Sequence, residues 1–308
     1  MNWKKIVGAL LALILVVTGV WTYMVTSYES DLGTDNIILV DASDIVTDLN
    51  TNNEMMHLSF DDGADDLLWS SMDIGLEIDG VSHTCSFGSQ STSSQVSEKI
   101  FTKLGADGQT FTVEIDASDE EEFTYLQVDK QLAGNSSDHW MRFSSTDIYL
   151  GEGIVWTFLE GTSFGDVVEN PTSDLSNNTE DRLEWYTYDM SVHRVDPNDG
   201  IYIVAKDNKW FKIKFLSYYN SHDESRFPTM QIAALNGTTF SALSNPDLVV
   251  PSPCKIVTED IEAVYWSKNE TITLVENGID LCDQNCTVII HIEYETILVA
   301  VSESEITI

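Results

Sequence analysis

Short runs in which apolar and polar residues alternate make up most of this chain, and Gly, Asn, Asp or Ser bound each run. The run KWFKIKFLSYY (209–219) places Phe211, Ile213 and Phe215 on one side of an extended strand, with Lys212 on the other. Helical periodicity is scarce after the first 30 residues. The pattern therefore predicts an all-β fold made of antiparallel modules.

The first 30 residues contain one long apolar segment. Lys4 and Lys5 precede Ile6–Val25, twenty residues without a charge. A helix of this length spans the ~30 Å hydrocarbon core of a bilayer. Basic residues before the segment and acidic residues after it predict an uncleaved, single-pass anchor in the cell membrane, with the bulk of the chain extracellular. A cleaved signal peptide and a pilin-type leader containing Gly8 are the alternatives.

Acidic residues dominate the charge of the chain. It has 15 Lys+Arg against 51 Asp+Glu, a formal net charge of −36. This argues against nucleic acid as a partner, because binding to phosphates requires basic residues. With 43% hydrophobic residues the chain still has enough apolar area for folded cores. The window 194–226 is close to neutral, with six basic and five acidic residues, and it contains the lysine-rich strand.

Changes in composition divide the part after residue 30 into three segments. Residues 31–105 are predicted to form an acidic β-rich domain, residues 106–246 an aromatic-rich β domain, and residues 247–308 a C-terminal β domain of hairpins. In the first segment, Met72–Ile78 alternates apolar and acidic residues and ends at a turn, Asp79-Gly80.

Four cysteines are candidates for disulfides, because an extracellular location favours oxidation. Cys282 and Cys286 are close enough in sequence to close a small loop. Cys254 is an alternative partner for either of them, and Cys85 could reach across domains. The sequence does not choose among the pairings.

An acidic stretch, Phe60–Asp66, has the oxygen-rich composition that calcium prefers. It lacks the spacing of an EF-hand loop and its closing glutamate. A solvated turn is therefore the default interpretation, with a calcium site as the alternative.

Three stretches, in order, resemble the HmuY family. They are TVEIDASDEEEFTYLQVD (112–129), HWMRFSSTDIYLGEG (139–153) and WYTYDMSVHRVDPNDGIYIVAKDNKWFKIKFLSYYN (185–220). Met141 departs from the pattern, because the family usually has an aspartate after the preceding tryptophan. The resemblance covers about 110–235, which is under half of the chain.

The resemblance implies an antiparallel all-β domain and a function. Characterised HmuY proteins are attached to the cell surface, capture haem and deliver it to a transporter. Haem or a related tetrapyrrole is therefore the expected ligand of a membrane-anchored extracellular binding protein, with a haem-delivery partner or transporter as an expected partner. The resemblance also identifies Lys212 as a recurrent lysine of a core family strand.

Capture of haem requires axial ligands, usually His or Met, and cations for the propionates. His193 and His222 lie near the ends of the resembling window, and with Arg194 and Lys212 they form the predicted haem-binding set. Met190 and Met230 are substitute ligands in principle, with core packing as their competing interpretation. A structural or surface role is the competing interpretation of each histidine.

No catalytic motif is present: the sequence lacks G-x-S-x-G, H-E-x-x-H and a P-loop. A binding protein is therefore expected rather than an enzyme. The alternative function is structural, as a pilin-like or envelope adhesion protein without a small-molecule ligand. Gly8 in the leader and the first segment, which has no basic residue between Ile6 and Glu98, favour that alternative.

Overall fold

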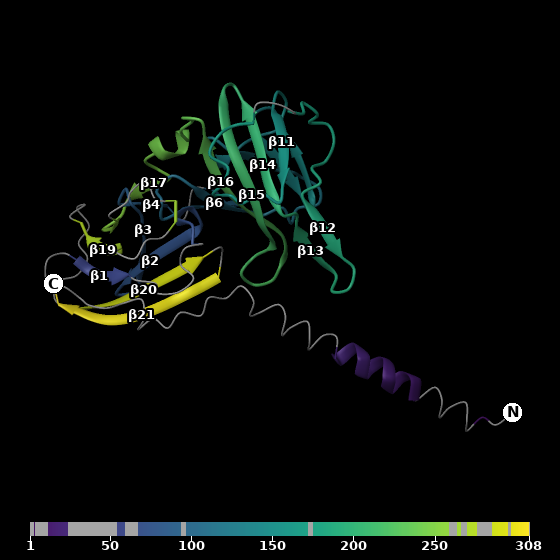
Figure 1. Ribbon diagram of the computed structural model, residues 1–308, viewed down its shortest axis with the longest axis horizontal. Coiled ribbons are helices and arrows are strands. Elements are labelled where there is room, and N and C mark those ends of the chain that lie inside the picture. Colours follow the sequence, from purple (N-terminus) through teal and green to yellow (C-terminus); the bar gives the residue numbers. More distant parts are fainter. Residues whose placement is uncertain are drawn as a thin grey trace. The chain divides into compact units, whose positions relative to one another are not determined.

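The computed structural model describes residues 3, 12–23, 54–58, 67–93, 97–171, 175–258, 264–265, 270–275, 285–294 and 297–307. By its internal contacts the chain divides into two units, Met1–Leu39 and Val40–Ile308. In the first unit, residues 12–23 are helical and belong to the predicted anchor segment (Figure 1). Among the described residues, no helix is long and apolar enough to cross a membrane.

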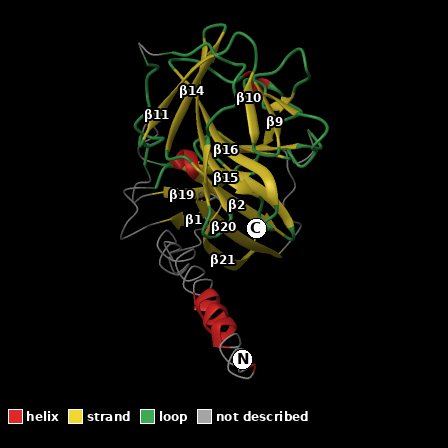
Figure 2. Cartoon of the chain, turned by 90° about the vertical axis from the view of Figure 1, so that its right-hand side faces the viewer, coloured by secondary structure: helices red, strands yellow, loops and turns green. Residues whose placement is uncertain are grey.

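The described part of the second unit consists of β-strands and two short 3-10 helices, η2 (Trp69–Ser71) and η3 (Ser241–Ser244) (Figure 2). The ladders between its strands are antiparallel. The predicted all-β class is therefore confirmed.

Two sheets build the region that resembles HmuY. The larger sheet has the order β11 (Val155–Glu160), β14 (Gly200–Lys206), β15 (Lys209–Tyr219), β16 (Ser225–Leu235), β6 (Phe111–Ile115) and β5 (Ile100–Leu104). The smaller has the order β10 (Asp147–Leu150), β9 (Met141–Ser144), β7 (Thr124–Gln127) and β8 (Leu132–Ala133). A separate ribbon pairs β12 (Tyr186–Asp189) with β13 (Arg194–Pro197).

The remaining strands come from both ends of the second unit. One sheet has the order β21 (Ile297–Thr307), β20 (Asn285–Tyr294), β2 (Met72–Ile78) and β3 (Val81–Cys85). Another has the order β1 (Glu54–Leu58), β19 (Glu270–Leu274) and β18 (Cys254–Val257), and β17 (Val249–Pro251) pairs with β4 (Gln90–Thr92). The predicted segments 31–105 and 247–308 thus contribute neighbouring strands, while their boundaries stay predictions.

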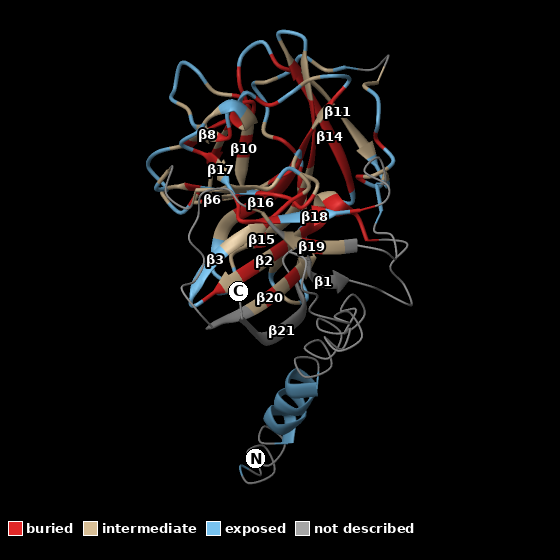
Figure 3. Ribbon diagram, turned by 90° about the vertical axis from the view of Figure 1, so that its left-hand side faces the viewer, coloured by how far each residue is buried: buried red, intermediate tan, exposed pale blue. Residues whose placement is uncertain are grey.

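The larger sheet is buried on both faces around β15. Phe211, Ile213 and Phe215 face the main hydrophobic core, as predicted from the alternation. Lys212 is also buried. On the neighbouring strands, β14 and β16 are buried over most of their lengths (Figure 3). The face of β15 that carries Lys212 is therefore also covered by other residues of the chain. The alternation did not predict this burial.

Turn residues fix the register of the hairpins. Asp79 and Gly80 join β2 to β3 and both have positive φ, 48° and 82°. Asp207 and Asn208 join β14 to β15 with φ of 52° and 63°. Two central residues with positive φ form the type I′ turn, whose twist matches that of the paired strands. The predicted turn at Asp79-Gly80 is confirmed.

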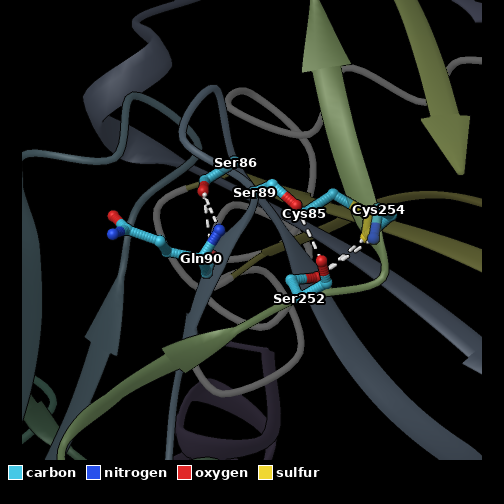
Figure 4. Close-up of a disulfide and its surroundings, with 6 residues drawn as sticks. All are labelled: Cys85, Ser86, Ser89, Gln90, Ser252 and Cys254. Carbon is cyan, nitrogen blue, oxygen red and sulfur yellow. Dashed lines mark hydrogen bonds between the residues drawn. A yellow bond between two sulfur atoms is a disulfide. The ribbon is translucent and has the colours of Figure 1, made fainter. Parts of the chain in front are cut away.

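A disulfide between Cys85 and Cys254 connects β3 to β18, across 169 positions of the sequence (Figure 4). Both cysteines are fully buried. Ser89 Oγ donates a hydrogen bond of 2.7 Å to the carbonyl oxygen of Ser252 beside the bond (Figure 4). The pairing is one of the alternatives that the sequence left open. A bond between Cys282 and Cys286 falls outside the described residues.

Replacement of Cys85 and Cys254 together by serine is expected to lower the free energy of unfolding by about 2–4 kcal/mol, because the bond restricts the unfolded chain. Urea unfolding of the variant and the oxidised wild type measures this loss. Val257→Ser, on an exposed position of β18, is the control and should change stability by less than about 0.5 kcal/mol. An unchanged midpoint in the double variant would contradict the structural role of the bond.

Candidate functional site

The two histidines predicted to bind haem lie at the turns of two hairpins. His193 ends the turn between β12 and β13, and His222 lies in the turn between β15 and β16. Both side chains are exposed. Their strands are far apart in sequence, so only the tertiary fold decides whether the two turns meet.

An ion pair joins the two turns. The two terminal nitrogens of Arg194 donate to the carboxylate of Asp223, Nη2 to Oδ1 at 2.7 Å and Nη1 to Oδ2 at 3.2 Å. Arg194 directly follows His193, and Asp223 directly follows His222. Two parallel hydrogen bonds fix orientation as well as distance, so the pair brings both histidine-bearing turns to one place.

Tyr219, near the end of β15, completes the junction. The guanidinium of Arg194 lies over its ring, 3.9 Å from the centre. The backbone N–H of Val195 donates to the Tyr219 hydroxyl at 3.0 Å. The start of β13 is thereby docked on the end of β15.

The backbone of His193 adopts a left-handed conformation, with φ of 59°. Histidine is among the residues that tolerate this region best, so the turn itself accounts for part of the choice of residue. Its Nδ1 lies 3.0 Å from the hydroxyl of Tyr188. Met190, in the same turn, is 72% exposed. We name this cluster, Tyr188, Met190, His193, Arg194, Tyr219, His222 and Asp223, the hairpin-end site.

The negative charge of Asp223 faces a cation. The hydrogen bonds from Arg194 lower the pKa of the Asp223 carboxyl below its ordinary value of 3.8. The carboxylate is therefore ionised at neutral pH, and the ion pair is lost only when the pH falls through the lowered pKa.

Lys212 lies elsewhere. Its amine donates to the carbonyl oxygens of Phe164, at 2.6 Å, and Val167, at 2.9 Å. Burial lowers the pKa of Lys212 from 10.5 to about 8, and the charges of Asp107 and Asp166 limit the shift. The structure thus separates this residue from the three other predicted site residues, His193, His222 and Arg194.

Sequence reasoning missed the tyrosines and the acid of the hairpin-end site. Asp223 stands directly after His222, as Arg194 stands after His193, and this repeated placement of a charge after a histidine was the available signal. Tyr188 and Tyr219 could not be assigned, because their partners depend on the docking of the two hairpins.

The described part of the chain has no metal site built from several protein ligands. No group of three or more His, Cys, Asp or Glu side chains there could hold a metal ion. The predicted calcium stretch, Phe60–Asp66, lies outside the described residues. Each of the two histidines in the hairpin-end site carries an imidazole that can ligate a metal ion.

The comparisons with known proteins give partial similarity. No family model matches the chain, and no curated protein is detectably similar to it. A solved structure described as an HmuY-like haem-binding protein from Bacteroides vulgatus has 12% identity, with 41% of this chain and 91% of that chain covered, at a TM-score of 0.33.

Two further solved structures are similar to the same extent. The HmuY analogue of Tannerella forsythia, in its apo form, has 14% identity, with 45% of this chain and 98% of its own covered, at a TM-score of 0.34. A protein described as a lipoprotein from Bacteroides fragilis has 16% identity, with 41% and 90% covered, at a TM-score of 0.33. Part of the chain is therefore similar to HmuY-like structures.

Replacement of Asp223 by Asn is expected to loosen the junction, because it removes the charge that Arg194 contacts. An exposed ion pair contributes up to about 1 kcal/mol, so hydrogen exchange of the Val195 amide should accelerate about two- to fivefold. Glu224→Gln is the control, because this carboxylate accepts a hydrogen bond from Asn220 within the same turn. Equal exchange rates in the two variants would contradict the junction.

The lowered pKa of Lys212 predicts a pH dependence of stability. Between about pH 8 and pH 10.5 the unfolded chain holds a proton that folded Lys212 has released, so this residue makes the free energy of unfolding rise with pH. The rise should be about 3 kcal/mol. Urea unfolding of the wild type and of Lys212→Met across this pH range measures the rise. The difference between their free energies of unfolding should change with pH by this amount. A constant difference would contradict the lowered pKa.

Proposed function

We propose that this protein captures haem, or a related tetrapyrrole, at the hairpin-end site. The observation that carries the proposal is the Arg194–Asp223 ion pair, which brings together the turns of His193 and His222. Two imidazoles on turns that the ion pair joins are the kind of donor set that haem iron accepts. The ordered HmuY-like motifs of the sequence provide independent support.

Each residue of the site has a role in the proposal. His193 and His222 ligate the iron, and the contact between Tyr188 and His193 Nδ1 orients that ring. If haem binds here, these two histidines would hold it, and the group would supply the iron that they ligate. Arg194 positions the second turn through Asp223, so its charge is already engaged and its role toward the propionates is secondary.

Binding rather than catalysis suits the exposure of the site. The histidine side chains reach solvent from hairpin turns. We place the protein at the cell surface on an N-terminal anchor, where captured haem passes to a transporter or another delivery partner. A pilin-like or envelope role is the alternative when haem is not bound.

A titration of the full-length protein with haemin, followed by absorbance, tests the proposal. We expect haemin to produce a saturable, sharpened Soret band. The apparent affinity for haemin should fall at least tenfold in His193→Asn and in His222→Asn. Asparagine suits position 193 because it also tolerates positive φ. His139→Asn is the control, because His139 packs on Tyr125 away from both turns.

If the absorbance shows no saturable change with either oxidised or reduced haem, haem capture is refuted. A saturable band that neither site variant weakens, or that His139→Asn weakens equally, would refute the assignment of the site. In the first case the structural role would become the leading hypothesis.

A further inference from the structure

A cavity of about 340 Å³ lies against strands β15 and β16, and it is separate from the hairpin-end site. Its size is within the range of small-molecule sites, roughly 300–1,000 Å³. Aromatic and apolar side chains form much of its wall: Trp69, Phe87, Phe164, Leu235 and Phe240. Val168 lines the cavity and is 67% exposed, so the cavity reaches solvent beside it.

Lys212 supplies the positive charge of this wall. Its side chain is 91% buried, since its relative exposure is 9%. Across the sheet it lies between Ile203 of β14 and Ala233 of β16, which are both buried. The ring of Phe164 covers the amine, with its centre 4.2 Å away. An ammonium is thus held in an apolar setting.

The amine retains hydrogen-bonding capacity. A lysine ammonium has three donors, and two of them are used by the carbonyl oxygens of Phe164 and Val167. Within the described part of the chain, no third hydrogen bond and no ion pair of Lys212 is formed. Carbonyl dipoles offset part of the cost of burial, but they do not neutralise the charge.

Asp107 is the acid of the cavity wall, and its oxygens are already occupied. Oδ1 accepts the backbone N–H groups of Gln109 and Thr110, each at 2.9 Å, and Oδ2 accepts the Thr110 hydroxyl at 2.6 Å. The carboxylate therefore holds its own turn. Lys212 is left as the group of the cavity that can accept a new charged partner.

We propose that this cavity binds a small amphipathic carboxylate, with its anionic group on the amine of Lys212 and its apolar or aromatic body against Phe164 and Trp69. A charge-assisted hydrogen bond from a partly desolvated ammonium is stronger than one between neutral groups. The chain as a whole carries a charge of −36, so a single apolar-bodied anion suits the cavity better than a polyanion.

The charge state of Lys212 gives the proposal a pH signature. The pKa of Lys212 lies at about 8, because burial disfavours the ammonium while Asp107 and Asp166 favour it. A bound carboxylate also favours the ammonium, so it raises this pKa. Binding is therefore strongest below about pH 8 and weakens as the free amine forms above it.

Fluorescence titration of the full-length protein with 2-naphthoate, and with the neutral 2-naphthamide as its isostere, tests the proposal. At pH 6.5 we expect saturable binding of 2-naphthoate that is at least tenfold tighter than that of the amide. Lys212→Met should abolish this preference. Raising the pH to 10 should reduce the preference of the wild type for 2-naphthoate about tenfold or more, while its affinity for the amide stays unchanged.

A second pair of variants applies where Lys212→Met fails to fold, as circular dichroism would show. Val168→Glu places a negative charge at the mouth of the cavity, and Val168→Gln is its neutral match. The first should weaken 2-naphthoate several-fold relative to the second and leave the amide unaffected. Equal binding of the two probes, a preference for 2-naphthoate that survives Lys212→Met, or no saturable binding of either probe would overturn the proposal. None of these results depends on haem binding.

Discussion

Strand β15 is buried on both faces, and the arrangement around it follows from this constraint. One face carries the aromatic side chains of the main core. The other carries Lys212, whose ammonium cannot be buried without acceptors. The segment containing Phe164 and Val167 supplies two carbonyl oxygens and two apolar side chains to this face. The amine of Lys212 thereby anchors the segment that packs on this face of the sheet.

The few cations of this acidic chain are placed where they hold elements together. Arg194 connects two hairpin turns through Asp223, and Lys209 connects β15 to Asp129 at 2.6 Å. Lys212 differs, because its described partners are carbonyl oxygens. Lys212 and Tyr219 are seven positions apart on β15, which is roughly 20 Å in an extended strand. The cavity and the hairpin-end site are therefore separate places on one structural element.

The sequence predicted the local structure better than the site. Alternation gave the buried positions of Met72–Ile78 and the core-facing positions Phe211, Ile213 and Phe215 of β15 correctly, because side chains of a strand point alternately to its two faces. The turn at Asp79-Gly80 followed from the residues that accept positive φ. The second cover over Lys212 did not follow, since no local pattern shows which distant segment packs on a strand.

The same limit explains the disulfide and the site residues. Cys85 and Cys254 are paired because β3 and β18 are neighbours, which depends on contacts between the two ends of the second unit. The sequence predicts that Arg194 contacts an anionic ligand, whereas in the structure its guanidinium donates to the carboxylate of Asp223. That contact joins the turns that carry the two histidines, and the sequence indicated these residues only by their closeness to the motif.

The strength of the junction bears on what the hairpin-end site can do. An exposed ion pair such as Arg194–Asp223 contributes at most about 1 kcal/mol, so this contact by itself joins the two turns only weakly. Behind the turns, Val195 of β13 and Tyr218 of β15 belong to the main core. A ligand bridging both turns would be gained or released by movement of the turns alone. A weakly joined pair of turns beside a packed core is consistent with the capture and release that we propose.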